Sequence, residues 1–389
     1  MEDRIYDYWA ATLQNGYLGD LAGLVDRAGG ARSLFGMTET LLKKIPGITD
    51  RLAEHIIGNR PPVETVEKSY YEMMEQGICY VNHTDDDFPE KLTNIPGMPY
   101  GLFVKGALPD PQIPSVAIVG ARECSEYGRL MAEFLGSRLA KEGVQIISGM
   151  AWGIDGIAQN AALSAGSRSF AVLGCGVDVV YPAKNRQLYN RLCDGGSGII
   201  SEYAPGTHAV ARLFPPRNRI ISGLCDVLIV VEARKRSGTL ITVDMAIDQG
   251  RCVMVIPGRL TDSLSMGCLN LLYQGALPVT GIESVLEQLN IGRQLCLEDT
   301  VPKKASVRPY HRPSKTPADG MIPAGLPDMP EDMLSVAKHL TLDPQSTEAI
   351  AEKAGLSPDR ILIILTELEL DGIAREVSPG YFVRCVTVS

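Results

Sequence analysis

The sequence has few of the residues from which enzymes most often build a catalytic centre. Its 389 residues include five histidines, and His208 is the only one between residues 115 and 290. His208 lies far along the chain from any serine or cysteine that would form a nucleophile elbow, and the sequence has no Walker A or H-E-x-x-H motif. Asp155 could act as a general base, but we favour a role in fixing its loop or capping the next helix. We therefore expect a protein that is not an enzyme and needs no cofactor.

Cysteine pairs, metal-ligand patterns and long apolar runs are also lacking. The nine cysteines include no C-x-x-C pair, and no histidine stands at metal-ligand spacing from any of them. Cys175, Cys225 and Cys252 lie in or beside apolar runs, where a reduced thiol behaves as a small hydrophobic group. No run approaches the roughly 18 apolar residues that span a bilayer, and the acidic start MEDRIYDYW lacks the apolar core of a signal peptide. The sequence therefore predicts a cytoplasmic protein with no metal site, no disulfide framework and no membrane contact.

Acidic residues outnumber basic residues in the chain, but the basic residues are unevenly distributed along it. The formal net charge is −9 and the isoelectric point is about 5.2, which disfavours a nucleic-acid partner if only the average is considered. A proline-rich basic linker is predicted for residues 298–330. Its basic residues, with no acid between the first and the last, are Lys303, Lys304, Arg308, Arg312 and Lys315. The distribution of charge is therefore more informative than its sum.

The first 65 residues are predicted to form a domain of short helices. In the segment LLKKIPGITDRLAEHI, residues 41–56, an apolar stretch, the pair Pro46-Gly47 and a second amphipathic stretch indicate a helix-hairpin-helix-like or SAM-like unit. The turn of such a unit can offer backbone N–H groups to a DNA phosphate, or its helices can simply pack together. The sequence leaves both interpretations open.

Residues 66–297 are predicted to form the central domain, with residues 66–114 as its connector. Between residues 115 and 290, apolar β-rich runs such as SVAIV and DVLIVVEA alternate with helical stretches. This alternation predicts an α/β fold with a Rossmann-like, doubly wound parallel sheet that is covered by helices on both faces. Residues 331–389 contain three helical stretches and then the strand-like runs REV and YFVRCV, which together predict a winged helix.

A glycine-containing loop follows nearly every predicted strand of the central domain. The glycines are Gly120, Gly149, Gly153, Gly174, Gly176, Gly238 and Gly258. Ligands of an open parallel sheet bind beyond the carboxyl ends of its strands, where glycine permits close approach and the following helix presents free N–H groups. The pattern predicts an anion-binding edge, although the same glycines could serve only to make tight turns.

Cationic and polar side chains are expected at the same edge. They are Arg122, which follows Gly120; Arg217, Asn218 and Arg219, which begin a helix after Phe214; and Arg234, Lys235 and Arg236, which precede Ser237, Gly238 and Thr239. An arginine presents a planar fork that suits phosphate oxygens, and Phe214 could stack on an unpaired base. A single arginine in this set could equally be a solvated surface charge, but the group as a whole favours phosphate binding.

The motifs of this region resemble those of the DNA-processing protein A family, the DprA/Smf proteins. In order they are SVAIVGAR, SGMAWGID, LGCGVDVVYPAKN, SEY, FPPRNRIISGL, VVEARKRSGTLIT, AIDQGRCVMVIPG and GCLNLLYQGA. The resemblance covers roughly residues 100–280, and the helical front and winged-helix tail are similar to the family's three-part layout. It implies a homodimer that binds single-stranded DNA without catalysis, protects incoming DNA and helps to load the RecA recombinase in natural transformation.

The resemblance also implies a set of DNA-binding residues. These are Arg122, Gly149, Arg217, Asn218, Arg219, Ser237, Gly238 and Thr239, to which Arg212 and Phe214 are added because they precede the R-N-R motif. The chain departs from the family at Ala158-Gln159, where Ala-His is common, and at Gly267-Cys268-Leu269, where Gly-Thr-Asn is frequent. The first departure changes a polar loop residue and the second a helix start. Neither touches the arginines, so we expect DNA binding to survive both.

The predicted winged helix carries more acid than base. Its recognition helix has one arginine and four acids, Asp359, Glu367, Glu369 and Asp371, which is unfavourable beside a phosphate backbone. We therefore expect this domain to contact protein and not DNA, which argues against a duplex-binding transcription regulator.

Two further alternatives follow from short segments. The SGTLIT segment is similar to the Gly-Gly-x-Gly-Thr loop of lysine-decarboxylase-like nucleotide hydrolases, but Leu240, Ile241 and Thr242 follow where those enzymes have an acid. The helix that contains Leu269, Leu271 and Leu272 is either a dimer face or a helix packed on its own sheet.

Overall fold

The computed structural model describes residues 2–15, 19–297, 330–341, 344–378 and 380–385. The chain forms two compact units, residues 1–293 and residues 294–389, and each is described here by itself. The basic residues predicted for the linker, from Lys303 to Lys315, lie outside the described residues. No helix in the described ranges has the length and apolar character needed to cross a membrane.

The first unit is built around a nine-stranded sheet with the order β1-β2-β6-β5-β4-β3-β7-β8-β9. Its strands are β1 (Ile78–Asn82), β2 (Gly101–Gly106), β3 (Ser115–Val119), β4 (Gln145–Ser148), β5 (Ser169–Leu173), β6 (Gly198–Ser201), β7 (Val227–Val230), β8 (Cys252–Val255) and β9 (Leu277–Pro278). All neighbouring strands from β6 to β9 pair in parallel, and β1 and β2 join the β6 edge antiparallel. The prediction of a doubly wound parallel sheet is confirmed.

The chain reverses its direction of winding at β3. From β3 it proceeds through β4 and β5 to β6 on one side, and then returns to pair β7 with the free side of β3. The register sets Val116 opposite Val227 and Val119 opposite Val230. In an open α/β sheet, such a reversal leaves a crevice beyond the carboxyl ends of the two central strands.

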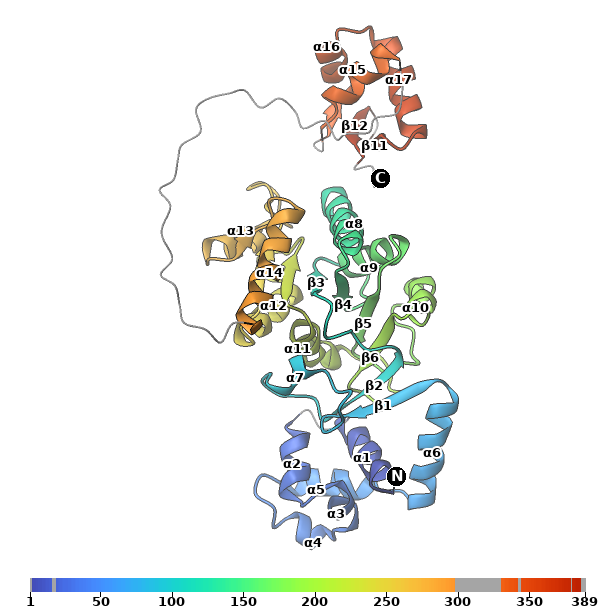
Figure 1. Ribbon diagram of the computed structural model, residues 1–389, viewed down its shortest axis with the longest axis vertical. Helices are drawn as coiled ribbons and strands as arrows, with labels where there is room; N and C mark the ends of the chain where they lie inside the picture. The colour runs from blue at the N-terminus through green and yellow to red at the C-terminus, as the bar shows by residue number, and fades with distance from the viewer. Residues whose placement is uncertain (1, 16–18, 298–329, 342–343, 379, 386–389) are drawn as a thin grey trace. The chain divides into compact units, whose positions relative to one another are not determined.

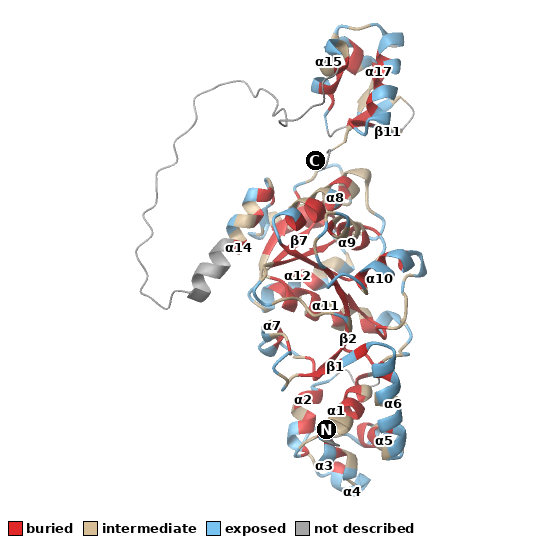
Figure 2. Ribbon diagram, turned by 45° about the vertical axis from the view of Figure 1, so that its right-hand side comes forward, coloured by how far each residue is buried: buried red, intermediate tan, exposed pale blue. Residues whose placement is uncertain are grey.

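Helices cover both faces of this sheet because its central strands are apolar on both sides (Figures 1 and 2). The helices that connect the parallel strands or follow them are α8 (Glu126–Lys141), α9 (Ile154–Ser164), α10 (Arg186–Leu192), α11 (Phe214–Leu224), α12 (Gly238–Asp248), α13 (Met266–Tyr273) and α14 (Ile282–Leu297). Val116 and Ile118 pack with α8, α9 and α14, whereas Ala117 and Val119 pack with α11, α12 and α13. The alternation of β3 side chains therefore separates two apolar layers.

The N-terminal helices share a hydrophobic core with the antiparallel edge of the sheet. They are α1 (Glu2–Thr12), α2 (Leu21–Arg27), α3 (Ala31–Gly36), α4 (Glu39–Leu42), α5 (Asp50–Gly58) and α6 (Val63–Glu75), and α7 (Glu90–Thr93) follows β1. The ring of Tyr8 contacts those of Tyr80 on β1 and Phe103 on β2. The two helices and the turn predicted around residues 41–56 are present as α4, the turn that contains Gly47, and α5, and the Thr49 hydroxyl caps α5 by accepting the Leu52 N–H over 3.2 Å.

The second unit is a winged helix, as predicted. Its elements are α15 (Glu331–His339), β10 (Gln345–Ser346), α16 (Thr347–Ala354), α17 (Pro358–Leu370), β11 (Ala374–Ser378) and β12 (Tyr381–Arg384). The three strands form a sheet with the order β10-β12-β11. Gly355 ends α16 in the left-handed region at φ 68°, and Ile364 and Leu368 of α17 are fully buried in the core.

Candidate functional site

A cleft of about 430 Å³ lies at the reversal point of the sheet. Its walls come from the loop after β3, the first turn of α11 and the first turn of α12, all of which meet beyond the carboxyl ends of β3 and β7. Seven of the residues predicted from the sequence line it: Arg122, Phe214, Arg217, Asn218, Ser237, Gly238 and Thr239. The structure therefore brings together most of the predicted set.

The first turn of α12 presents an anion-binding group to the cleft. Ser237 is the N-cap residue, and its hydroxyl accepts the Thr239 N–H over 3.2 Å. The Thr239 hydroxyl in turn donates to the carbonyl of Gly120 over 3.2 Å, which ties α12 to the loop after β3. A Cβ atom on Gly238 would meet nothing within 4 Å, so the approach to the free N–H groups of this turn is open.

Arg122 and Phe214 form the accessible part of the opposite wall. The Arg122 side chain is exposed, and its guanidinium carbon lies 5.8 Å from the centroid of the Phe214 ring. The ring of Tyr181 lies 5.5 Å from the Phe214 ring, and a Cβ atom on Gly174 would come within 2.9 Å of that ring. Gly174 thus leaves room for Phe214, and a cation and two aromatic rings face one opening.

Arg217 has a different environment from the other predicted arginines. It is 5 % exposed, and its Nη1 atom donates to the carbonyl of Gly149 over 3.2 Å and to the carbonyl of Val172. Burial lowers the pKa of this guanidinium to about 10, although the nearby Asp155 carboxylate favours its charged form. Arg217 therefore joins the ends of β4 and β5 from inside the protein and presents little surface to the cleft.

Gly149 and Asp155 complete the same buried group. An Asp155 carboxylate oxygen accepts the Gly149 N–H over 3.0 Å, and a Cβ atom on Gly149 would lie 2.9 Å from both Asp155 and Arg217. Burial raises the pKa of Asp155, and the charge of Arg217 opposes that rise. The N–H group of Gly149 is bound by Asp155 and its carbonyl by Arg217, so Gly149 holds these two buried side chains in place and has no backbone group left for a ligand. Asp155 fixes its loop, as the sequence indicated.

Arg219 lies outside the cleft. Its Nη2 atom donates to the Glu202 carboxylate over 2.5 Å, and its Nε atom donates to the Gly97 carbonyl over 2.6 Å. Two residues along an α-helix correspond to a rotation of about 200°, so Arg217 and Arg219 point to nearly opposite sides of α11. Arg212, on the short helix Ala211–Leu213, is exposed but is not one of the residues that line the cleft.

Three exposed cations precede the first turn of α12. They are Arg234, Lys235 and Arg236, and the buried residues 231–233 separate them from the end of β7. Among the described residues that line the cleft, Asp155 is the one acid, and it is buried. The accessible part of this edge is therefore positive although the whole chain is negative.

Three residues beside the cleft were missed by the sequence analysis. Trp152 and Tyr181 are exposed aromatic side chains, and the Nζ atom of Lys184 lies 5.0 Å from the centroid of the Trp152 ring. Trp152 and Tyr181, together with Phe214, line a small hollow that adjoins the cleft. A tryptophan in the loop directly after Gly149 was the available signal, since a residue there follows a strand of the sheet.

Gln159 is a buried helix residue of α9, which corrects its assignment to a loop. Its oxygen accepts the Met150 N–H over 3.1 Å, and its amide nitrogen donates to the Phe170 carbonyl over 3.0 Å. The side chain therefore connects the loop after β4 to β5, and the departure from the family's histidine falls on a residue that holds the backbone.

The second departure, at Gly267-Cys268-Leu269, falls on α13. Cys268 and Leu271 are buried against the sheet, and Leu272 packs against the same apolar layer. Leu269 is half-buried. Two of the three leucines thus pack on their own sheet, and whether α13 also forms a dimer face stays a prediction.

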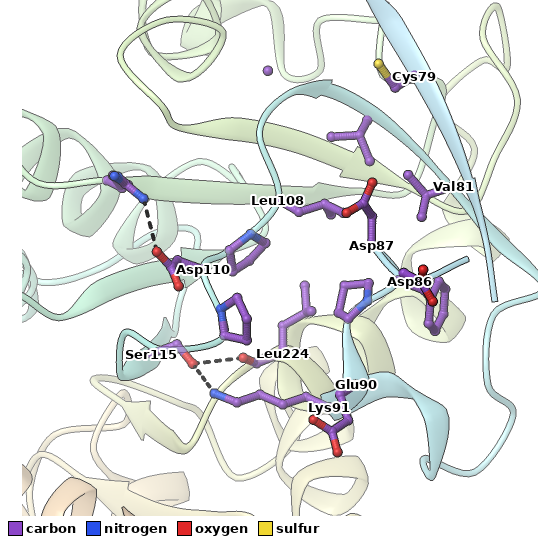
Figure 3. A pocket seen from close by; sticks show the side chains of 17 residues that line it. Cys79, Val81, Asp86, Asp87, Glu90, Lys91, Leu108, Asp110, Ser115 and Leu224 are labelled. Atoms are coloured by element: carbon purple, nitrogen blue, oxygen red, sulfur yellow. Dashed lines mark hydrogen bonds and ion pairs between the residues drawn. The ribbon is translucent and has the colours of Figure 1, made fainter. Parts of the chain in front are cut away.

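A larger pocket, of about 530 Å³, lies beside β1, β2 and the start of β3 (Figure 3). The acids that line it are Asp86, Asp87, Glu90 and Asp110. Its two cations are engaged, because Lys91 lies 2.7 Å from Asp226 and Arg168 lies 3.7 Å from Asp110. Carboxylates repel phosphate, so the smaller, positive cleft is the better candidate for an anionic ligand despite its size. Among the described residues, no three histidine, cysteine, aspartate or glutamate side chains gather where they could hold a metal ion.

The family models and the curated relatives point to one family. Residues 79–290 match the family described as DNA recombination-mediator protein A, and residues 323–378 match the DprA winged helix domain. The DNA processing protein DprA of Streptococcus pneumoniae is 44 % identical over 204 residues, which cover 52 % of this chain and 72 % of that protein. Protein Smf of Escherichia coli is 35 % identical over 336 residues, or 86 % of this chain and 84 % of that protein.

Solved structures are similar as well. The X-ray structure of DNA processing protein A from Streptococcus pneumoniae superposes with a TM-score of 0.62 and 32 % identity, and covers 74 % of this chain and 97 % of that chain. A structure of DNA processing protein A from Helicobacter pylori, which concerns that protein's single-stranded DNA binding, has a TM-score of 0.47 and 28 % identity over 56 % of this chain and 96 % of that chain. The chain belongs to the DNA recombination-mediator protein A (DprA/Smf) family, because the family model matches more than half of it and protein Smf of Escherichia coli is similar over 84 % of its own length.

Proposed function

We propose that the cleft binds single-stranded DNA and that the protein acts as a mediator of recombination without catalysing a reaction. The observation that carries the proposal is the pairing of the exposed Arg122 over the Phe214 ring with the open first turn of α12 on the other side of the cleft. The cation and the helix N-terminus suit phosphates, and the ring suits the face of an unpaired base.

A single strand fits this arrangement better than a duplex. Base faces are free to stack only where the bases are unpaired, and the aromatic rings of Phe214 and Tyr181 line the opening. The three exposed cations from Arg234 to Arg236 extend the positive edge next to α12. Phosphate contacts of this kind bind without regard to sequence, so we expect little sequence preference.

Fluorescence anisotropy of a labelled oligothymidylate against a duplex of equal length, over a range of salt concentrations, tests the proposal. We expect tighter binding of the single strand, with an affinity that falls as salt rises. Arg122→Ala should weaken binding about tenfold and reduce the slope of log affinity against log salt by about 0.7, the value for one phosphate of a single strand. Lys68→Ala, on the exposed side of α6, is the matched control and should change neither quantity.

Absence of binding by the folded protein would overturn the proposal. In that event, release of free base from a nucleoside monophosphate would favour the nucleotide-hydrolase alternative. Asp155, the one acid among the described lining residues, is engaged by the Gly149 N–H, which is unfavourable for a general base. We therefore propose a binding role for this cleft.

We infer that the protein protects incoming single strands, helps to load the RecA recombinase during natural transformation, acts as a homodimer and works in the cytoplasm. The family assignment supports these roles. An increase in the rate of RecA filament formation on single strands when the protein is added, lost in Arg122→Ala, would test the loading role, and light scattering of the full chain would test the dimer.

A further inference from the structure

Trp152 is an exposed aromatic side chain at the edge of the cleft. Its side chain lies in the loop between β4 and α9 and is 48 % exposed, although tryptophan is usually among the more buried residues of a protein. The other tryptophan of the chain, Trp9, is 1 % exposed, and its indole N–H donates to the Asn59 carbonyl over 2.7 Å. Packing in the hydrophobic core therefore explains the presence of a tryptophan at position 9 but not at position 152.

Side chains from two other segments form hydrogen bonds with the backbone of the loop that carries Trp152. Met150 adopts a left-handed conformation at φ 51°, and its N–H and carbonyl are bound by Gln159 over 3.1 Å and by Asn185 over 2.9 Å. The Asn185 amide also donates to the Ala151 carbonyl over 3.2 Å. An exposed ring on a backbone fixed in this way loses little conformational entropy when a ligand stacks on it.

The surroundings of Trp152 continue the cleft. A hollow of about 90 Å³ is lined by Trp152, Tyr181 and Phe214, and Arg122 and Tyr181 line both this hollow and the cleft. The ammonium of Lys184 lies 5.0 Å from the centroid of the Trp152 ring. Lys184 directly precedes Asn185 in the chain, so the residue that fixes the loop also sets the position of the cation. A path of aromatic and cationic groups thus leads from α12 past Phe214 to Trp152.

We propose that Trp152 is a stacking platform for one unpaired nucleobase of a strand that leaves the cleft, and that Lys184 binds a phosphate beside that base. This proposal rests on the proposed function of the cleft. The exposed indole offers a face to a base, and the neighbouring ammonium offers a charge to the backbone on which that base is carried. Because every base has an aromatic face, the platform adds affinity for single strands without adding a sequence preference.

Intrinsic fluorescence tests the stacking directly, because the chain has two tryptophans and Trp9 is inaccessible. We expect oligothymidylate to quench the emission of the full-length protein, and we expect no quenching in Trp152→Phe, whose remaining emission comes from Trp9. Phenylalanine can still stack, so Trp152→Phe should bind the oligonucleotide within about threefold of the wild type in anisotropy.

Removal of the ring should weaken binding. Trp152→Ala should lose about 5- to 150-fold in affinity, the range found for the loss of one base–aromatic stack. Tyr71→Ala, which removes a comparably exposed ring from α6, is the matched control and should bind as the wild type does. Lys184→Met should lower the salt slope by about 0.7 and leave the quenching in place. Circular dichroism of each variant establishes that it is folded.

Oligonucleotides with abasic sites separate stacking from phosphate contact. If the ring stacks on a base, abasic substitution and Trp152→Ala should weaken binding by less together than the product of their separate effects. Binding without quenching, with Trp152→Ala equal to the wild type, would overturn the stacking platform and leave the cleft as a binding site; the exposed ring would then suit a protein contact. No binding of oligonucleotide at all would overturn the function of the cleft and the platform with it.

Discussion

The guanidinium of Arg219 donates to the carboxylate of Glu202 over 2.5 Å, and the two side chains are 13 % and 4 % exposed. The same guanidinium binds the carbonyls of Gly97 and Pro216. We expect Arg219→Ala to lower the free energy of unfolding by about 3–5 kcal/mol, because it leaves the Glu202 charge buried without its partner. Urea denaturation followed by circular dichroism measures the change.

Two variants make this prediction specific. Arg219→Ala combined with Glu202→Gln should recover part of the loss, since no unpaired charge then remains. Arg122→Ala, at an exposed position, should change stability by less than about 0.5 kcal/mol while it weakens DNA binding. If Arg219→Ala were as stable as the wild type but unable to bind single strands, the role assigned to Arg219 would be wrong.

Gln159 provides a second test of stability. Gln159→Leu removes the acceptor of the Met150 N–H and a donor to the Phe170 carbonyl, and a buried N–H group left unpaired costs about 1–3 kcal/mol. Gln159→His should be tolerated better, because one ring nitrogen can accept while the other donates. Thermal unfolding of the two variants should therefore rank histidine above leucine, and the reverse order would contradict the hydrogen-bonding role.

The winged helix is expected to contribute little to DNA affinity. Arg360, the one cation of α17, is paired with Asp332, and Leu362, Ile363 and Leu370 of the same helix are exposed. A helix whose single cation is engaged and whose apolar side chains are exposed suits a protein partner better than a phosphate backbone. Deletion of residues 326–389 should leave the single-strand affinity within about twofold, and a tenfold loss would contradict this expectation.

Cys175 allows a test by chemical labelling. It is buried below the hollow that adjoins the cleft, and burial raises the pKa of its thiol to about 11. At pH 8 only about one thiol in a thousand is then ionised, and the thiolate is the reactive form. We expect maleimide to label the exposed Cys79 in the folded protein and Cys175 only after unfolding, as measured by mass spectrometry of the labelled peptides. Rapid labelling of Cys175 at pH 8 would contradict its burial.

The fold could be predicted because the sequence repeats one physical pattern. Strands such as β3 and β7 are apolar on both sides and are separated by helical stretches, so a covered parallel sheet follows from composition and order alone. The antiparallel strands β1 and β2 were placed in a connector. They lack that repeated pattern, and only the pairing of β2 with β6 joins them to the sheet.

The site could be predicted as a region but not residue by residue. Arg122, Arg217 and Arg219 have the same chemistry in the sequence, yet one is exposed and two are engaged inside the protein. Arg217 and Arg219 lie on α11, and the direction in which each points depends on the rotation of that helix against the sheet, which their spacing alone does not reveal. Trp152 was overlooked for the converse reason, because an aromatic residue beside a strand is normally part of the core.

The outermost strand of the large sheet ends on a residue that cannot continue it. Pro278 stands opposite Val255 at the end of β9, and proline has no amide hydrogen to offer to a further strand. Another copy of the chain therefore cannot add a regular strand to this side of the sheet. Copies that met at this edge would contact one another through helices and side chains and not through a continuous sheet.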